Sequence, residues 1–393
     1  MAYINGIGII SPQNTLPGSE FLEPVVEHHS DFLKSVEPVY RTYIDPIASR
    51  RLSRLIKMGI SAAKICLQDA GDGMQDAGCK MQDAGCKMQD AGYKMQDAGY
   101  KMQDAGYKMQ DAGCKMPDAI ITGTGLGSVE DTEKILGELT IEEKFLNPTP
   151  FIQSTYNTIS SQIAIHLKCH QYNSTYVHRC FSLESCLIDA LLQIADGSSV
   201  NVLAGGIDEM TLNHLTIIRR LGLWKREPIS NLGLWESQVP GALPGEGAAY
   251  FLISGAKTEK TYARLEAVET LYKPASNSET ADFISRFLDE NKLSSRDIDL
   301  VLMGNNGDAS HDAICNDVMA EALPQSAKVR YKHLCGEFHT VSGFAMYTGA
   351  NILKRQQLPA SLRVLPLAPE KLNNILIHNH FMNTDHSFIL LRR

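Results

Sequence analysis

The chain has 393 residues, a formal net charge of -8 and a hydrophobic fraction of 44%, which is enough apolar material for one large or two medium cores. The negative charge argues against general binding to nucleic acid or to an anionic membrane surface, because both require excess positive charge. No basic stretch precedes the short apolar run at the N-terminus, and no segment is long enough to cross a bilayer, so we expect a cytoplasmic protein without membrane insertion.

Apolar periodicity predicts helices and strands that alternate along the chain. In the first half we expect helices at 49–70, 155–167 and 182–195, and strands at 2–10, 119–122, 200–204 and 248–253. In the second half we expect strands at 300–303 and 387–391, and helices at 278–291, 315–323 and 341–354. Gly205 and Gly206 are expected to end the strand at 200–204. This alternation predicts mostly parallel sheets covered by helices.

Six tandem copies of a heptapeptide, MQDAGCK or MQDAGYK, occupy residues 74–115, between the first expected helix and the second strand. A period of seven is compatible with a coiled coil. Each copy, however, has only two larger apolar positions and contains a glycine, which costs a helix about 1 kcal/mol. We interpret the array as a polar insertion into a loop that leaves the fold intact, with the coiled coil as the alternative.

The nine cysteines form no recognisable framework. Three of them, Cys79, Cys86 and Cys114, lie in the repeat, and the others are scattered without the spacing of a zinc site. Reduced thiols in the cytosol are therefore expected.

Several segments carry a family resemblance. Residues 176–209, YVHRCFSLESCLIDALLQIADGSSVNVLAGGIDE, contain a cysteine before a helix, then a glycine turn, an apolar strand and an A-G-G-x-[DE] end. This segment resembles the nucleophile region of the β-ketoacyl-ACP synthases. Other matching segments follow the family's order: INGIGIISP, TGTGLG, ALPGEGAAYFLIS and KHLCGEFHTVSGFA, the last in the frame K-S-x-x-G-H-x-x-x-A-S-G. The resemblance covers nearly the whole chain outside the repeat.

The resemblance implies a thiolase-like α/β fold with two pseudo-duplicated halves, residues 1–256 and 257–393, in a layered αβαβα arrangement. It implies an acyl carrier protein as the thioester donor, and a homodimer or a heterodimer with another ketosynthase. It implies no cofactor and no metal. The GTGLG run at 123–127 lacks the third glycine spacing of a dinucleotide fingerprint, so a nicotinamide cofactor is excluded.

Cys180 stands at the position of the family's acyl-accepting nucleophile. A thiol at a helix N-terminus feels the positive end of the helix dipole, which lowers its pKa. The alternative is a buried structural cysteine. The two histidines that assist condensation in the family are replaced by Asn306 and Glu337, and His339 follows the second position by two residues. Phe381 is the residue kept from the family's G-F-G-G loop, and its amide is expected in the oxyanion hole.

These departures leave two functions open. Asn306 can donate a hydrogen bond to a thioester carbonyl, whereas an ionised Glu337 raises the thiol pKa and repels an enolate. Each of these residues also has a structural alternative: turn chemistry for Asn306, a satisfied carboxylate for Glu337, and ordinary packing for His339 and Phe381. One reading is a condensing enzyme or acyltransferase with the acyl chain on Cys180. The other is a non-catalytic partner similar to the chain-length factors.

Two further alternatives accompany these readings. A thiolase-like enzyme acting on CoA esters is a third function, which the G-E-G-A strand and the KHLCG block disfavour. The basic residues form either a docking surface for an acidic carrier or a solvated face; they are Arg50, Arg51, Arg54, Lys57, Arg219, Arg220, Lys225 and Arg226.

Overall fold

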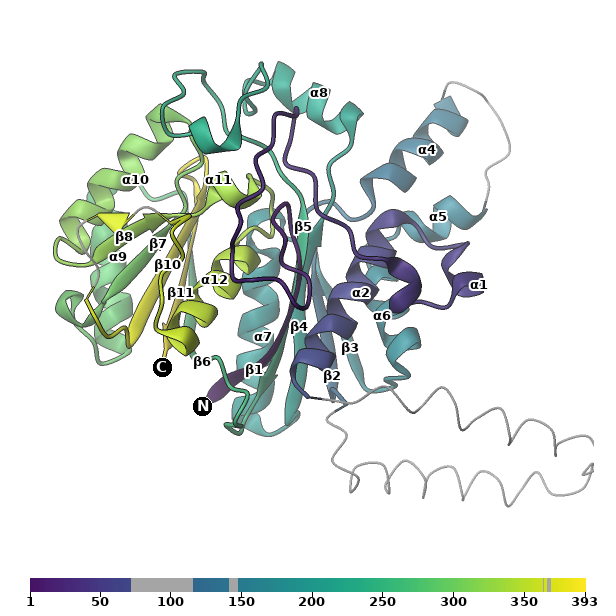
Figure 1. Cartoon of the computed structure of the whole chain (residues 1–393), viewed down its shortest axis with the longest axis horizontal. Coiled ribbons are helices and arrows are strands. Elements are labelled where there is room, and N and C mark those ends of the chain that lie inside the picture. Colours follow the sequence, from purple (N-terminus) through teal and green to yellow (C-terminus); the bar gives the residue numbers. More distant parts are fainter. Residues whose placement is uncertain (72–115, 141–147, 363, 366–368) are drawn as a thin grey trace, which may run out of the picture.

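The computed structural model describes residues 1–71, 116–140, 148–362, 364–365 and 369–393 (Figure 1). The heptapeptide array lies outside the described residues. The elements that flank it, helix α2 (Arg54–Asp69) and strand β2 (Ala119–Gly123), are the helix and the strand expected there. None of the helices within these ranges is both long enough and apolar enough to span a membrane.

The strands of the first half follow the order β3-β2-β4-β5-β1. Their bounds are β1 (Ala2–Ile10), β3 (Tyr172–Tyr176), β4 (Asn201–Asp208) and β5 (Gly247–Ser254). Strand β2 pairs in parallel with β3 and β4, whereas β4 with β5 and β5 with β1 are antiparallel.

The second half repeats this arrangement in the order β8-β7-β10-β11-β6, with β9 (Val364–Leu365) added outside β8. The bounds are β6 (Ala263–Tyr272), β7 (Leu300–Met303), β8 (Ala327–Arg330), β10 (Asn374–Phe381) and β11 (Asp385–Arg392). Strand β7 pairs in parallel with β8 and β10, whereas β10 with β11 and β11 with β6 are antiparallel, as in the first half. The two halves are therefore pseudo-duplicates, and a short β1–β6 pairing joins them into one 11-stranded sheet. A domain boundary at residue 256 stays a prediction.

The helices form three layers around the two halves of the sheet (Figure 1). Helices α7 (Ser182–Asp196) and α12 (Ser342–Arg355) share the central core with the inner faces of both halves. Helices α2 and α6 (Thr158–Leu167) cover the outer face of the first half. Helices α9 (Asn277–Glu290) and α10 (Ala309–Ala322) cover that of the second. This is the expected αβαβα arrangement.

Further helical segments lie outside these layers. They are α1 (Pro46–Ser49), α4 (Val129–Thr140), α5 (Pro148–Ser154), α8 (Leu212–Arg220) and α11 (Lys332–Cys335), with 3-10 turns η1 (Tyr40–Thr42), η3 (Arg179–Phe181), η4 (Asn231–Gly233) and η5 (Ser295–Asp297).

Three expectations about the elements were wrong. The sheet is mixed rather than mostly parallel, because segments such as the three-residue loop between β10 and β11 form antiparallel hairpins. Strand β4 continues through Gly205 and Gly206 to Asp208. Helix α10 begins at Ala309, six residues early, because the carboxylate of Asp308 caps it by accepting from the amides of Ser310 and His311.

Candidate active site

Cys180 lies in the 3-10 turn η3, immediately before α7, and its side chain is almost fully buried, with 4% exposed. The turn is held by Ser182, whose hydroxyl accepts from the His178 amide (2.8 Å) and donates to the Thr124 carbonyl (2.9 Å). Gly123 at the end of β2 allows this contact, because a Cβ there would lie 2.6 Å from the Ser182 carbonyl carbon. Strand β2 therefore fixes where the sulfur stands.

His339 faces Cys180 from the second half, with its Nδ1 atom 3.2 Å from the sulfur. Asp208, at the end of β4, positions the turn that carries this histidine: its carboxylate accepts from the Thr340 amide (2.9 Å) and hydroxyl (2.8 Å). The same carboxylate accepts from the Gly125 amide at 2.7 Å. A Cβ on Gly125 would lie 2.2 Å from Cδ2 of the His339 ring, so only glycine leaves the ring its place.

Asn306, Glu337 and Lys332 form a buried polar group from the second half. The Lys332 ammonium donates to Glu337 Oε2 at 2.7 Å, and the Asn306 amide donates to the same oxygen at 3.2 Å. The ammonium also donates to the His380 carbonyl at 3.2 Å. The side chains of Lys332 and Glu337 are each only 1% exposed, so this is a buried ion pair rather than a surface contact.

Phe381 stands at the end of β10 and completes the wall beside His339. Its ring centroid lies 5.6 Å from that of His339 and 6.4 Å from that of Trp224. The two residues that follow it, Met382 and Asn383, have φ angles of 56° and 52°. The chain thus turns sharply after Phe381 without the glycines of the family's loop.

The sulfur and the imidazole are both uncharged at neutral pH. Burial raises the pKa of the Cys180 thiol well above its usual value, and the negative charges of Glu337, Asp385 and Glu184 raise it further, against Lys332. Burial therefore outweighs the lowering of the thiol pKa that was expected from the helix N-terminus. Burial also lowers the pKa of His339, although Asp208 opposes this. The site thus holds a thiol beside a neutral imidazole that can accept its proton.

Glu337 is the residue whose environment differs most from the expectation. Burial raises its pKa, and Lys332 and Asn306 oppose this rise. Its backbone is fixed as well, because its amide donates to the Leu243 carbonyl at 2.7 Å and its carbonyl accepts from Gly245 at 3.0 Å. Glu337 is therefore held in place by its backbone, with the Lys332 ammonium 2.7 Å from its Oε2 atom.

The structure brings His339 into contact with both Cys180 and Phe381. It joins Asn306 to Glu337 through a hydrogen bond. The two groups are linked electrostatically, because the charge of Glu337 raises the pKa of the Cys180 thiol. Sequence reasoning missed Lys332 as the partner of Glu337, although the lysine of the K-S-x-x-G-H frame was a signal for it. It also assigned no role to Asp208, although this residue is the acidic end of the A-G-G-x-[DE] segment, because a sequence pattern does not show which distant turn a carboxylate orients. Within the described ranges, no three metal-ligating side chains converge to hold a metal ion.

No protein-family model and no curated protein matches the sequence. Solved structures resemble it over 100% of its length. One is described as "The ishigamide ketosynthase/chain length factor", at 14% identity, with 98% of that chain covered and a TM-score of 0.75. A β-ketoacyl synthase from Burkholderia phymatum STM815 is 15% identical, with 99% covered and a TM-score of 0.73.

A third is a type II PKS acyl-carrier protein in complex with its ketosynthase bound to the hexaketide, at 14% identity, with 98% of that chain covered and a TM-score of 0.70. At these identities the likeness shows the fold. The chain has the thiolase-like fold of ketosynthases and chain length factors.

Proposed function

We propose that this protein takes an acyl chain from the thioester of an acyl carrier protein onto Cys180, as a β-ketoacyl-ACP synthase-like acyltransferase of fatty-acid or polyketide-type biosynthesis. The observation that supports this most directly is the 3.2 Å contact between the Cys180 sulfur and Nδ1 of His339, just before a central helix. A nucleophile within hydrogen-bond reach of a neutral base is the arrangement that nucleophilic catalysis needs.

The proposed transfer runs through His339. As the sulfur attacks the thioester carbonyl carbon, the thiol proton moves to Nδ1, and the carbonyl electron pair moves onto oxygen. The amides of Cys180 and Phe381, with the side-chain amide of Asn306, are the proposed donors to this oxyanion. When the tetrahedral intermediate collapses, the carrier thiolate leaves and takes the proton from His339. Because the thiol pKa is raised, proton transfer accompanies the attack instead of preceding it.

The site is less suited to the condensation that follows in ketosynthases. A carboxylate close enough to raise the pKa of Cys180 also disfavours an enolate beside that sulfur. Glu337 is bound to Lys332, so it does not swing away without breaking a buried ion pair. This supports the second candidate, a non-catalytic partner of a complete ketosynthase, comparable to the chain length factor named in one similar structure.

The proposed docking surface for the carrier is a basic patch formed by Arg219, Arg220 and Arg226, which line a cavity of about 450 Å³. Arg220 and Arg226 are exposed, and Trp224 between them packs against Phe381. An acidic carrier bound there stands beside the site. Within this patch, Arg219 pairs with Asp31 at 2.8 Å. Two other basic candidates make contacts within the protein. Arg54 pairs with Glu37 and Glu246, and Lys225 donates to the Gly307 carbonyl at 2.9 Å.

We also propose that the protein works as a homodimer or a heterodimer with another ketosynthase. Strand β3 is an edge of the described sheet, and its first residues are exposed. An open strand edge can pair with a second chain. Light scattering coupled to gel filtration tests this: a monomer that stays a monomer when mixed with a ketosynthase contradicts the proposal.

Acylation itself is tested by intact-mass measurement after incubation with an octanoyl-carrier protein. The expected result is one octanoyl adduct in the wild type, none in Cys180→Ala, and an adduct in Cys186→Ala, a matched control because Cys186 is also buried and lies on α7, the helix that Cys180 precedes. An adduct that persists in Cys180→Ala overturns the assignment. No adduct in the wild type, together with tight co-purification with a ketosynthase and altered product length, selects the partner function.

The docking surface has its own test. In the variant Arg220→Glu with Arg226→Glu, acylation by the carrier thioester should fall at least tenfold, whereas acylation by octanoyl-pantetheine should not change. Equal losses with both donors would show that the two arginines support the site and not the carrier.

A further inference from the structure

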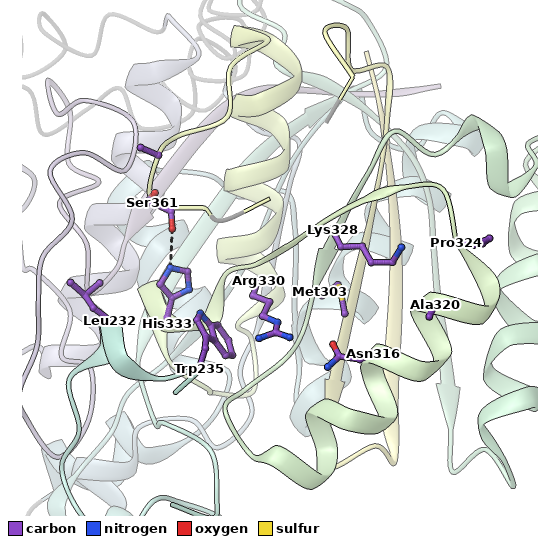
Figure 2. Close-up of a pocket in the computed structure, with 11 residues that line it drawn as sticks. Leu232, Trp235, Met303, Asn316, Ala320, Pro324, Lys328, Arg330, His333 and Ser361 are labelled. Carbon is purple, nitrogen blue, oxygen red and sulfur yellow. Dashed lines mark hydrogen bonds between the residues drawn. The ribbon is translucent and has the colours of Figure 1, made fainter. Parts of the chain in front are cut away.

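A cavity of about 800 Å³ lies outside the proposed active site, between β8, α10 and the loop that carries Trp235 (Figure 2). Its lining includes Trp235, Lys328, Arg330, His333 and Asn316, and none of Cys180, His339, Asn306, Glu337 and Phe381 contributes to it. The volume is in the range of small-molecule sites in proteins. The proposed reaction does not use this cavity.

Two cations point into the cavity from one strand. Lys328 and Arg330 are the partly exposed residues of β8, whose burial alternates. Their Cα atoms therefore share a face and lie about 7 Å apart along the strand, and Figure 2 shows the Lys328 ammonium directed toward Pro324. Among the described residues that line the cavity there is no aspartate or glutamate, and no described carboxylate forms an ion pair with either cation. The Asp312 carboxylate on α10 is within electrostatic reach of Arg330, which lowers the pKa of Asp312 against its burial.

An aromatic surface adjoins these cations. The Arg330 guanidinium carbon lies 5.0 Å from the centroid of the Trp235 ring, and Figure 2 shows the indole between Arg330 and His333. The imidazole of His333 meets the indole edge to face, with centroids 5.5 Å apart, and its Nε2 bonds the Ser361 carbonyl at 3.1 Å. The indole is thus held by two neighbours, with the Arg330 guanidinium over its ring, and its partly exposed remainder borders the cavity.

We propose that this cavity binds a small aromatic phosphate of nucleotide size, with its ring against Trp235 and its phosphate between Lys328 and Arg330. A phosphate monoester carries nearly two negative charges at neutral pH, and it therefore neutralises both cations where a carboxylate neutralises one. Arginine binds phosphate oxygens in a bidentate manner, and lysine adds a point charge. The Lys328 ammonium already donates to the carbonyls of Leu323 (2.6 Å) and Ser326 (3.1 Å), which fixes its position.

Calorimetric titration of the whole protein with AMP, GMP, CMP and UMP tests the proposal, with adenosine and inorganic phosphate as part-ligands. At least one nucleotide should bind saturably, and the part-ligands should bind at least tenfold more weakly. Lys328→Gln, Arg330→Gln and Trp235→Leu should each weaken binding about tenfold, the equivalent of about 1.4 kcal/mol.

Arg286→Gln is the matched control, because Arg286 also stacks on an aromatic ring, with its guanidinium carbon 4.5 Å from the Phe283 centroid, yet it does not line the cavity. Its affinity should equal that of the wild type. Thermal unfolding by circular dichroism identifies variants that have lost the fold. No saturable binding of any of the four nucleotides, or equal binding by Lys328→Gln, Arg330→Gln and the wild type, would overturn the proposal.

Discussion

Glu184 offers a direct test of the electrostatics around the proposed nucleophile. It lies on α7, one turn after Cys180, and its side chain is fully buried. Burial raises its pKa to about 7, and the neighbouring hydroxyls of Ser342 and Ser387 offset only part of this. Neither carboxylate oxygen makes a well-formed hydrogen bond to a described residue. The variant Glu184→Gln keeps the shape of the side chain and removes its ionisation.

The size of the effect follows from linkage. The folded state binds the Glu184 proton more tightly than the unfolded chain, so the stabilisation is complete below the unfolded pKa of 4.5 and is lost as pH rises through about 7. The difference of about 2.5 units corresponds to about 3 kcal/mol, at about 1.4 kcal/mol per unit. Relative to the wild type, Glu184→Gln should therefore gain about 3 kcal/mol in free energy of unfolding between pH 4.5 and pH 8.

Urea unfolding monitored by circular dichroism at several pH values measures this difference. Glu321→Gln, on the exposed side of α10, is the control and should follow the wild-type curve. If the Glu184→Gln and wild-type stabilities run parallel over the whole pH range, the carboxyl group does not titrate in a buried environment, and the reasoning fails.

Three other predictions concern the same site. Lys332→Met and Glu337→Leu should each lower the free energy of unfolding by about 3 to 5 kcal/mol, because each leaves a buried charge without its partner. The double variant should lose less than the sum of the two single losses. Additive losses in urea unfolding would contradict this. The rate at which iodoacetamide alkylates Cys180, measured by mass spectrometry, should be low at pH 8 and rise beyond pH 9. The rate should be higher in Glu337→Gln, because loss of the carboxylate charge lowers the thiol pKa. An unchanged rate in this variant would count against an electrostatic interaction between Glu337 and the thiol. Gly125→Ala should displace the His339 ring and slow acylation at least tenfold. Gly137→Ala is the control and should have no effect, because a Cβ at Gly137 has open space around it. Equal acylation rates in the wild type and both variants would exclude a role for the His339 ring.

The sequence by itself determined the parts of the molecule that depend on local periodicity. The strands at 2–10, 248–253 and 300–303 were predicted because helices cover both faces and leave continuous apolar runs. The strands β3, β6, β8 and β10 were not predicted, because polar residues interrupt their apolar runs, even in β10, whose central residues are buried. The order of the family-like motifs along the chain predicted the thiolase-like fold. The segment at 176–209 predicted that Cys180 precedes a helix, which is α7.

Only the tertiary structure decided strand direction, the partners of the charged groups and the protonation of the sulfur. His339 and Cys180 are separated by 159 positions, and Glu337, the partner of Lys332, is fixed by backbone hydrogen bonds to Leu243 and Gly245. The helix dipole seen in the sequence acts on Cys180 over one turn, whereas desolvation comes from every layer that covers it. Burial is a property of the whole fold, so a local pattern placed the thiol correctly but gave the wrong direction for its pKa.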